Sequence, residues 1–137
     1  MKHVTLPRTL VNQLLTHAQR NPEREVCGLI AADDGKPTRV RPVDNVAQNA
    51  DHLFRMDPKE QIDAMRAMRE AGEDLFAIYH SHPHAPPVPS VTDLEQVGYP
   101  EALYLIISLD TKGVLQMNGY YLSETGGLKV VDLSVEN

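Results

Sequence analysis

The chain has 137 residues, of which 42% are hydrophobic and 23% are charged, a size and composition typical of one folded domain. Its net charge of −6 argues against a surface that binds nucleic-acid phosphates, which requires clustered lysine and arginine. The single cysteine, Cys27, excludes an intrachain disulfide, and no apolar run approaches the roughly 20 residues that cross a bilayer. We therefore expect one cytoplasmic domain over residues 1–137, with no nucleic-acid or membrane partner.

Apolar periodicity predicts a first helix that begins near Pro7 and ends at Asn21-Pro22. Proline suits the first helical position, where its missing N–H would have no partner in any case. Leu10, Leu14 and Ala18 recur at helical spacing, so they should form the buried face.

A β-hairpin should follow this helix. The apolar run Val26–Ala32 stops at the turn signal Asp33-Asp34-Gly35, and Thr38–Val43 alternates as the returning strand. We interpret His52–Met56 as another short strand.

A second helix should begin at Asp57 and end near Gly72. Asp57 can cap it, Pro58 fits the first position, and Glu60 can reach back as in a capping box. Glycine is a common helix terminator. Three residues at helical spacing form its apolar stripe: Ile62, Met65 and Met68.

The second half of the chain is mainly strand. Leu75–Tyr79 is predicted to be a buried strand that runs directly into His80, and Ser90 can cap a short helix through Val97. The turn Asp110–Gly113 should join the first two of three further strands. These strands are Ala102–Leu109, Val114–Leu122 and Leu128–Val135.

A pair of histidines carries the strongest chemical signal. Side chains two positions apart on a strand share a face, so His80 and His82 can bind one metal ion if the strand extends that far. Asp93 follows a proline-rich loop that can fold its carboxylate back toward the imidazoles. Two nitrogens and one oxygen suit Zn²⁺, and three protein ligands leave the fourth position of a catalytic site open.

The whole pattern resembles the JAMM metallopeptidases, the catalytically competent MPN domains. That family has an early glutamate, then His-Ser/Thr-His-Pro, then Ser-x-x-Asp. The matching segments here are Glu25, His80-Ser81-His82-Pro83 and Ser90-Val91-Thr92-Asp93. The resemblance covers nearly the whole chain and implies an α+β, MPN-like (cytidine-deaminase-like) domain. Its sheet should be mixed and mainly antiparallel, flanked by two longer helices and a short one.

The resemblance also implies a mechanism and a substrate. His80, His82 and Asp93 would bind one Zn²⁺ per chain. Glu25 would act as the general acid/base, and Ser90 would donate a hydrogen bond to the developing oxyanion. The compact prokaryotic form of the family implies a ubiquitin-like sulfur-carrier protein as partner, cleaved at a peptide or isopeptide bond after its C-terminal glycines. A homodimer stays an open alternative to a monomer.

Three neighbouring residues admit other roles. Glu23 is an alternative base, although Glu25 directly precedes the apolar run. Cys27 would share a strand face with Glu25, so a reactive or metal-contacting thiol is an alternative to a buried apolar side chain. His84 could be solvated, compete as a metal ligand or contact substrate.

Two other functional classes compete with hydrolysis. The first is a non-catalytic MPN-type assembly module, which the intact ligand pattern argues against. The second is a zinc deaminase, which requires His-x-Glu and Pro-Cys-x-x-Cys, and neither sequence occurs. The sequence therefore favours a zinc metallopeptidase.

Overall fold

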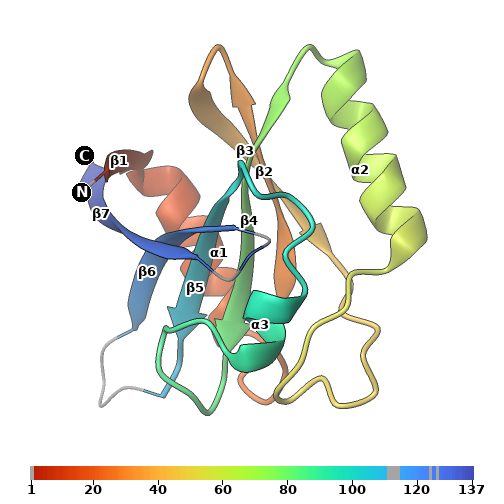
Figure 1. The fold of residues 1–137 in the computed structure, drawn as a ribbon. Coiled ribbons are helices and arrows are strands. Elements are labelled where there is room, and N and C mark those ends of the chain that lie inside the picture. Colours follow the sequence, from red (N-terminus) through yellow and green to blue (C-terminus); the bar gives the residue numbers. More distant parts are fainter. Residues whose placement is uncertain (1, 111–114, 124, 126) are drawn as a thin grey trace.

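The structure is a computed structural model that describes residues 2–110, 115–123, 125 and 127–137. Within these residues the chain forms seven strands and three helices (Figure 1). In chain order they are β1 (Lys2–Pro7), α1 (Arg8–Gln19), β2 (Cys27–Asp33), β3 (Lys36–Val43), α2 (Pro58–Glu70), β4 (Asp74–His82), α3 (Val91–Glu95), β5 (Leu103–Ser108), β6 (Gln116–Leu122) and β7 (Leu128–Glu136).

All seven strands belong to one sheet with the order β1-β7-β6-β5-β4-β2-β3. The pairs β1–β7 and β4–β5 are parallel. The other four pairs are antiparallel. A mixed, mainly antiparallel sheet with two longer helices and one short helix confirms the expected α+β class.

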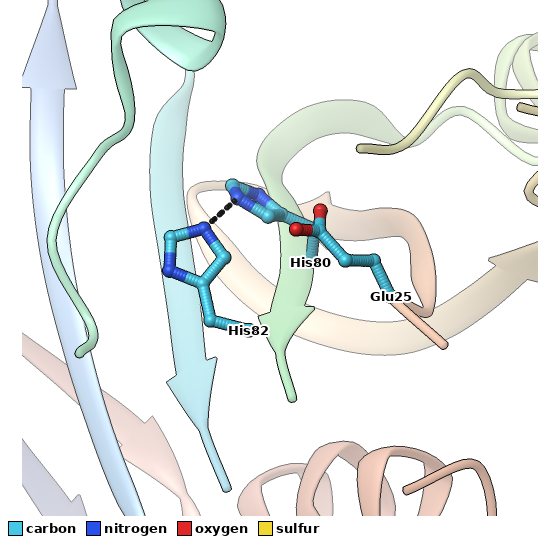
Figure 2. A group of neighbouring side chains, drawn as sticks. All are labelled: Glu25, His80 and His82. Atoms are coloured by element: carbon cyan, nitrogen blue, oxygen red, sulfur yellow. Dashed lines mark hydrogen bonds between the residues drawn. The ribbon is translucent and has the colours of Figure 1, made fainter. Parts of the chain in front are cut away.

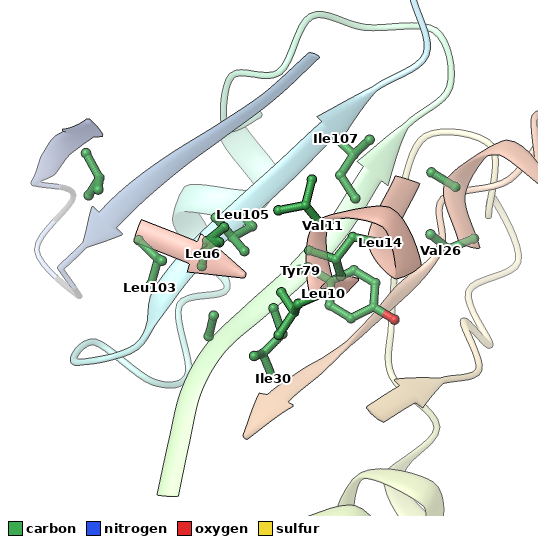
Figure 3. Close-up of a cluster of buried hydrophobic side chains, with 13 residues drawn as sticks. Leu6, Leu10, Val11, Leu14, Val26, Ile30, Tyr79, Leu103, Leu105 and Ile107 are labelled. Carbon is green, nitrogen blue, oxygen red and sulfur yellow. The ribbon is translucent and has the colours of Figure 1, made fainter. Parts of the chain in front are cut away.

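The sheet has an apolar core on each face, because its central strands alternate. On one face, Leu10 and Leu14 of α1 pack against Tyr79 of β4 and Leu105 of β5 (Figure 3). On the other face, Met68 of α2 belongs to a second cluster. That cluster includes Cys27, Leu29, Ile78, Tyr104 and Ile106. From Ile78 onward, the even-numbered positions of β4 therefore face α2 and α3.

The N-terminal segment differs from the sequence expectation in one respect. Pro7 is not the first helical residue but the last residue of β1, with extended backbone angles, and α1 begins at Arg8. The expected apolar face of this helix is confirmed. Strand β1 escaped prediction because it pairs with β7, at the other end of the chain, and such non-local pairing leaves little local signal.

The predicted ends of α2 are confirmed. The Asp57 side chain accepts a hydrogen bond of 3.1 Å from the Lys59 N–H. Gly72 adopts a φ of +72°, which favours glycine after a helix. The expected capping box is wrong, since the Glu60 carboxylate accepts instead from the Asp44 N–H at 3.2 Å. Ile62 is 59% exposed, so the buried stripe of α2 is narrower than expected.

The predicted strand His52–Met56 is wrong. Only Met56 pairs, in an isolated bridge with Asn45, and the rest of the segment is loop. Side-chain hydrogen bonds from Asn45 replace the strand ladder there. The short helix α3 ends at Glu95, two residues before the expected Val97. The predicted turn Asp110–Gly113 and the strand start at Val114 lie outside the described residues.

Strand β4 continues through His82, which confirms that both motif histidines are strand residues. Among the residues that the structure describes, no helix combines the length and apolar character that crossing a membrane requires.

Gly28 of β2 provides a test of this packing. A Cβ at this position would lie 2.5 Å from the Tyr79 hydroxyl oxygen and 2.7 Å from the Arg41 carbonyl oxygen. We expect Gly28→Ala to lower the free energy of unfolding by about 1–3 kcal/mol, measured by urea denaturation. Gly98→Ala is the matched control, because a Cβ there meets no described heavy atom within 4 Å. Equal stability of the two variants would contradict the packing of Gly28 against Tyr79.

Candidate active site

His80 and His82 lie at the carboxyl end of β4, on the sheet face that carries α2 and α3. Both are buried, and their Nε2 atoms are 3.1 Å apart. The strand fixes them from both sides, because His80 is opposite Cys27 of β2 and Ile106 of β5. The intervening Ser81 points to the other face, where its Oγ accepts a hydrogen bond of 2.8 Å from the Val26 N–H.

Asp93 reaches the two histidines from α3. Its Oδ2 is 3.1 Å from Nε2 of His80 and 3.2 Å from Nε2 of His82. A capping box orients this carboxylate: the Ser90 N–H donates to Oδ2 at 2.9 Å, and the Asp93 N–H donates to Ser90 Oγ at 3.0 Å. The sequence Ser-x-x-Asp thus caps the start of α3 and also orients the Asp93 carboxylate toward the two imidazoles.

The protonation of these groups follows from their partners. The Nδ1 atom of His82 lies 2.8 Å from the Pro86 carbonyl oxygen, which can only accept, so Nδ1 carries the proton and the neutral ring has its lone pair on Nε2. Burial lowers the pKa of His80, which favours its neutral form. Burial alone would raise the pKa of Asp93, but its close contacts with the imidazoles of His80 and His82 hold it well below its usual range.

Glu25 lies two residues before the start of β2, and its carboxylate points toward the imidazole of His80 (Figure 2). Ligand-capable atoms of Glu25, His80 and His82 all lie within 4.8 Å of one another. Glu25 is 4% exposed, and its Oε1 has no hydrogen-bond partner among the described residues. Burial raises the pKa of Glu25 to about 8, although the His82 imidazole opposes the shift.

The arrangement can hold a divalent metal ion. Zinc–ligand bonds of 2.0–2.1 Å in tetrahedral geometry separate the ligand atoms by about 3.3 Å. The nearly equal separations of 3.1, 3.1 and 3.2 Å within His80, His82 and Asp93 approach this spacing. Glu25 could replace Asp93 as the third ligand, but the Asp93 oxygen contacts both imidazoles directly. With Asp93 as the third ligand, Glu25 would be free to exchange a proton.

The three ambiguous residues lie in different surroundings. Glu23 is exposed and lies 3.4 Å from the exposed His84, so this pair forms on the surface away from the buried cluster. Cys27 is buried, and its thiol donates to the Val43 carbonyl oxygen at 3.3 Å. Burial raises the pKa of Cys27 to about 12, so the group is a neutral thiol rather than a reactive thiolate.

Two further residues at the site escaped sequence reasoning. Phe54 stacks on His80 with ring centroids 4.4 Å apart, and the buried Asn45 binds the backbone of Glu25. Both belong to the segment that joins β3 to α2, part of which we expected to be a strand. A lone phenylalanine and a lone asparagine give no sequence signal for such roles.

A pocket of about 320 Å³ adjoins the site, and His80 and Asp93 form part of its wall. Most of the remaining wall is apolar or aromatic, including Phe54, Ile78 and Tyr99. Such a pocket, with a few polar groups at one end, is typical of a binding site for part of a substrate.

Three proteins of known name are similar to this chain. A desampylase of Haloferax volcanii is 39% identical over 72% of this chain and 76% of its own length. A CysO-cysteine peptidase of Mycobacterium tuberculosis is 38% identical over 72% of this chain and 68% of its own length. A probable TtuB-protein conjugate cleaving protease of Thermus thermophilus is 32% identical over 77% of this chain and 70% of its own length.

Solved structures show the same fold. The solution structure of a Desulfitobacterium hafniense protein matches 97% of this chain and 92% of its own, with a TM-score of 0.84 and 30% identity. A JAB1/MPN-domain protein from Archaeoglobus fulgidus matches the whole of this chain and 98% of its own, with a TM-score of 0.58 and 17% identity. Residues 7–118 match the family described as prokaryotic homologues of the JAB domain, and the chain therefore belongs to that family.

Proposed function

We propose that this chain is a zinc-dependent metallopeptidase that hydrolyses a peptide or isopeptide bond after the C-terminal glycines of a ubiquitin-like sulfur-carrier protein. The observation that carries the proposal is the triangle of two imidazole nitrogens and one carboxylate oxygen beside the buried Glu25. The names of the relatives support it, since two are called a peptidase and a protease, the latter acting on a protein conjugate.

The proposed roles follow from the positions of the side chains. His80, His82 and Asp93 would hold zinc, which supplies a polarised carbonyl and a water of lowered pKa. Glu25 accepts the proton of the attacking water and then passes it to the leaving amine. Its burial bears on this task, because a raised pKa makes the carboxylate a stronger base than a solvated glutamate and lets it hold the accepted proton until the amine leaves.

Ser90 is proposed to stabilise the oxyanion. Its backbone N–H is already used by Asp93, and its Oγ accepts from the Asp93 N–H, so the hydroxyl proton is free to be donated. A donor directed at the developing charge contributes about 10²–10³ in rate in other hydrolases.

The pocket beside His80 and Asp93 gives the substrate room to approach these groups. A non-catalytic assembly module would have no use for four polar side chains converging in a largely buried cluster, since burying such groups costs stability. The geometry therefore favours the enzyme over that alternative.

Zinc binding tests the ligand assignment. We expect His82→Ala to lose most of the bound zinc, because removing one of three ligands leaves an incomplete coordination shell. His84→Ala is the matched control, since His84 is exposed and paired with Glu23. The measurement is zinc per chain by elemental analysis. An unchanged zinc content in His82→Ala would refute the ligand role.

Hydrolysis tests the role of Glu25. We expect Glu25→Gln to keep its zinc and to lose most of its activity, at least 10²-fold by analogy with other general bases. Glu23→Gln should retain activity, because Glu23 is exposed. Candidate carriers with C-terminal extensions would be incubated with each zinc-loaded variant and read by intact mass. Full activity of Glu25→Gln would assign the proton transfer to another group.

The pH dependence of stability tests the burial of Glu25. Between its ordinary pKa of 4.5 and the raised value of about 8, the folded protein keeps a proton that the unfolded chain releases. The free energy of unfolding of the chelator-treated protein should therefore fall as pH rises through this window. Glu25→Gln should show a shallower fall in Tm than wild type, and Glu23→Gln should follow wild type. Parallel Tm curves for wild type and Glu25→Gln would exclude the raised pKa.

A further inference from the structure

Asn45 is a buried polar residue just after β3, and it uses the full hydrogen-bonding capacity of its amide. Its Nδ2 donates to the carbonyl oxygens of Glu25 at 2.9 Å and Leu53 at 2.8 Å. Its Oδ1 accepts from the N–H groups of Ala47 at 3.0 Å and Arg55 at 2.9 Å. A buried side chain with four satisfied bonds rigidly fixes the backbone segments that it joins.

One of these segments carries Glu25. This residue precedes the first paired residue of β2, Cys27, so the sheet ladder does not hold its backbone. Instead the Glu25 N–H donates to the Ala50 carbonyl oxygen at 2.6 Å, and the Glu25 carbonyl oxygen accepts from Asn45. Arg24 adds a bond of 2.6 Å from its guanidinium to the Asn45 carbonyl oxygen.

The other segment carries Phe54. Asn45 binds the residues on both sides of it, Leu53 and Arg55, and the Phe54 ring stacks on His80 at an interplanar angle of 24°. A single amide thus connects the backbone of the proposed proton carrier with the segment that packs on one of the proposed zinc ligands.

We propose that Asn45 is a positioning residue that fixes the carboxyl group of Glu25 relative to His80 and His82. The expected loss of kcat rests on the proposed function. The expected loosening of the Glu25 backbone rests only on the hydrogen bonds of Asn45. The amide is chemically required, because an aspartate of the same shape would place a carboxylate oxygen, in the position of Nδ2, against the Glu25 and Leu53 carbonyl oxygens. A displacement of about 1 Å at a catalytic group can cost about 10²-fold in rate.

The experiment compares Asn45→Asp, Asn45→Ser and Asn21→Ala as zinc-loaded full-length proteins. Asn45→Ser keeps one hydrogen-bond donor in its hydroxyl group, and it replaces Asn45→Asp in the comparison if the aspartate variant does not fold. Asn21 is the matched control, because its Nδ2 also donates to a backbone carbonyl, that of His17 at 3.0 Å, but at the end of α1. The measurements are zinc content, kcat and KM on a carrier that wild type cleaves, and amide hydrogen exchange over residues 24–26 and 44–57.

We expect the folded Asn45 variants to keep their zinc and to lose about 10- to 100-fold in kcat, with KM changing little. Hydrogen exchange should rise in both segments, and Asn21→Ala should match wild type in every measurement. A kcat near the wild-type value in a folded Asn45 variant, or a loss fully explained by lost zinc, would overturn the positioning role.

The same experiment separates this inference from the proposed function. If wild type cleaves no carrier in the panel, the proposed function fails and hydrogen exchange alone decides about Asn45. Faster exchange around Glu25 in Asn45→Ser, but not in Asn21→Ala, would then support the positioning role. Unchanged exchange would overturn it.

Discussion

The alternation of side chains along β4 is the constraint on which the rest of the structure depends. Because successive residues point to opposite faces, Tyr79 and Ser81 face α1 while Ile78, His80 and His82 face α2 and α3. The strand is central in the sheet, held by β2 on one side and β5 on the other. Two imidazoles are thereby fixed side by side on a rigid element, which is a better support for a metal ligand than a loop.

Asp93 and Glu25 reach this strand from two other segments, and local hydrogen bonds hold each segment in place. Asp93 completes the capping box of α3, so the bonds that start the helix also orient the carboxylate. Glu25 is placed by the loop after β3, through Asn45 and Ala50, rather than by a strand ladder. The site therefore combines one rigid strand, β4, with two segments that side-chain hydrogen bonds hold in place, the start of α3 and the residues before β2. Substitutions can displace these two segments more easily than the strand.

Burial gives these groups their chemical character. The side chains of Glu25, His80, His82 and Asp93 converge where solvent is largely excluded, so a charge on any of them destabilises the fold unless it is paired. The contacts of Asp93 with both imidazoles lower its pKa and favour its ionised form, whereas Glu25 has one oxygen without a partner among the described residues and a pKa raised to about 8. Two carboxyl groups in one cluster thus have pKa values shifted in opposite directions, and such a difference separates acid from base roles in many hydrolytic sites.

The sequence by itself determined the elements whose signals are local: the face of α1, the turn at Asp33-Asp34-Gly35, the Asp57-Pro58 start of α2, and the residue types and spacing of the histidine motif. Only the tertiary structure decided which distant groups meet. Strand β1 pairs with residues at the far end of the chain, and the segment at His52–Met56 is bound by an asparagine instead of pairing as a strand. The tertiary structure also placed Glu25 beside His80 and His82 and placed Glu23 on the surface. Periodicity records which face a residue occupies, but contacts between segments far apart in sequence depend on packing that no local pattern encodes.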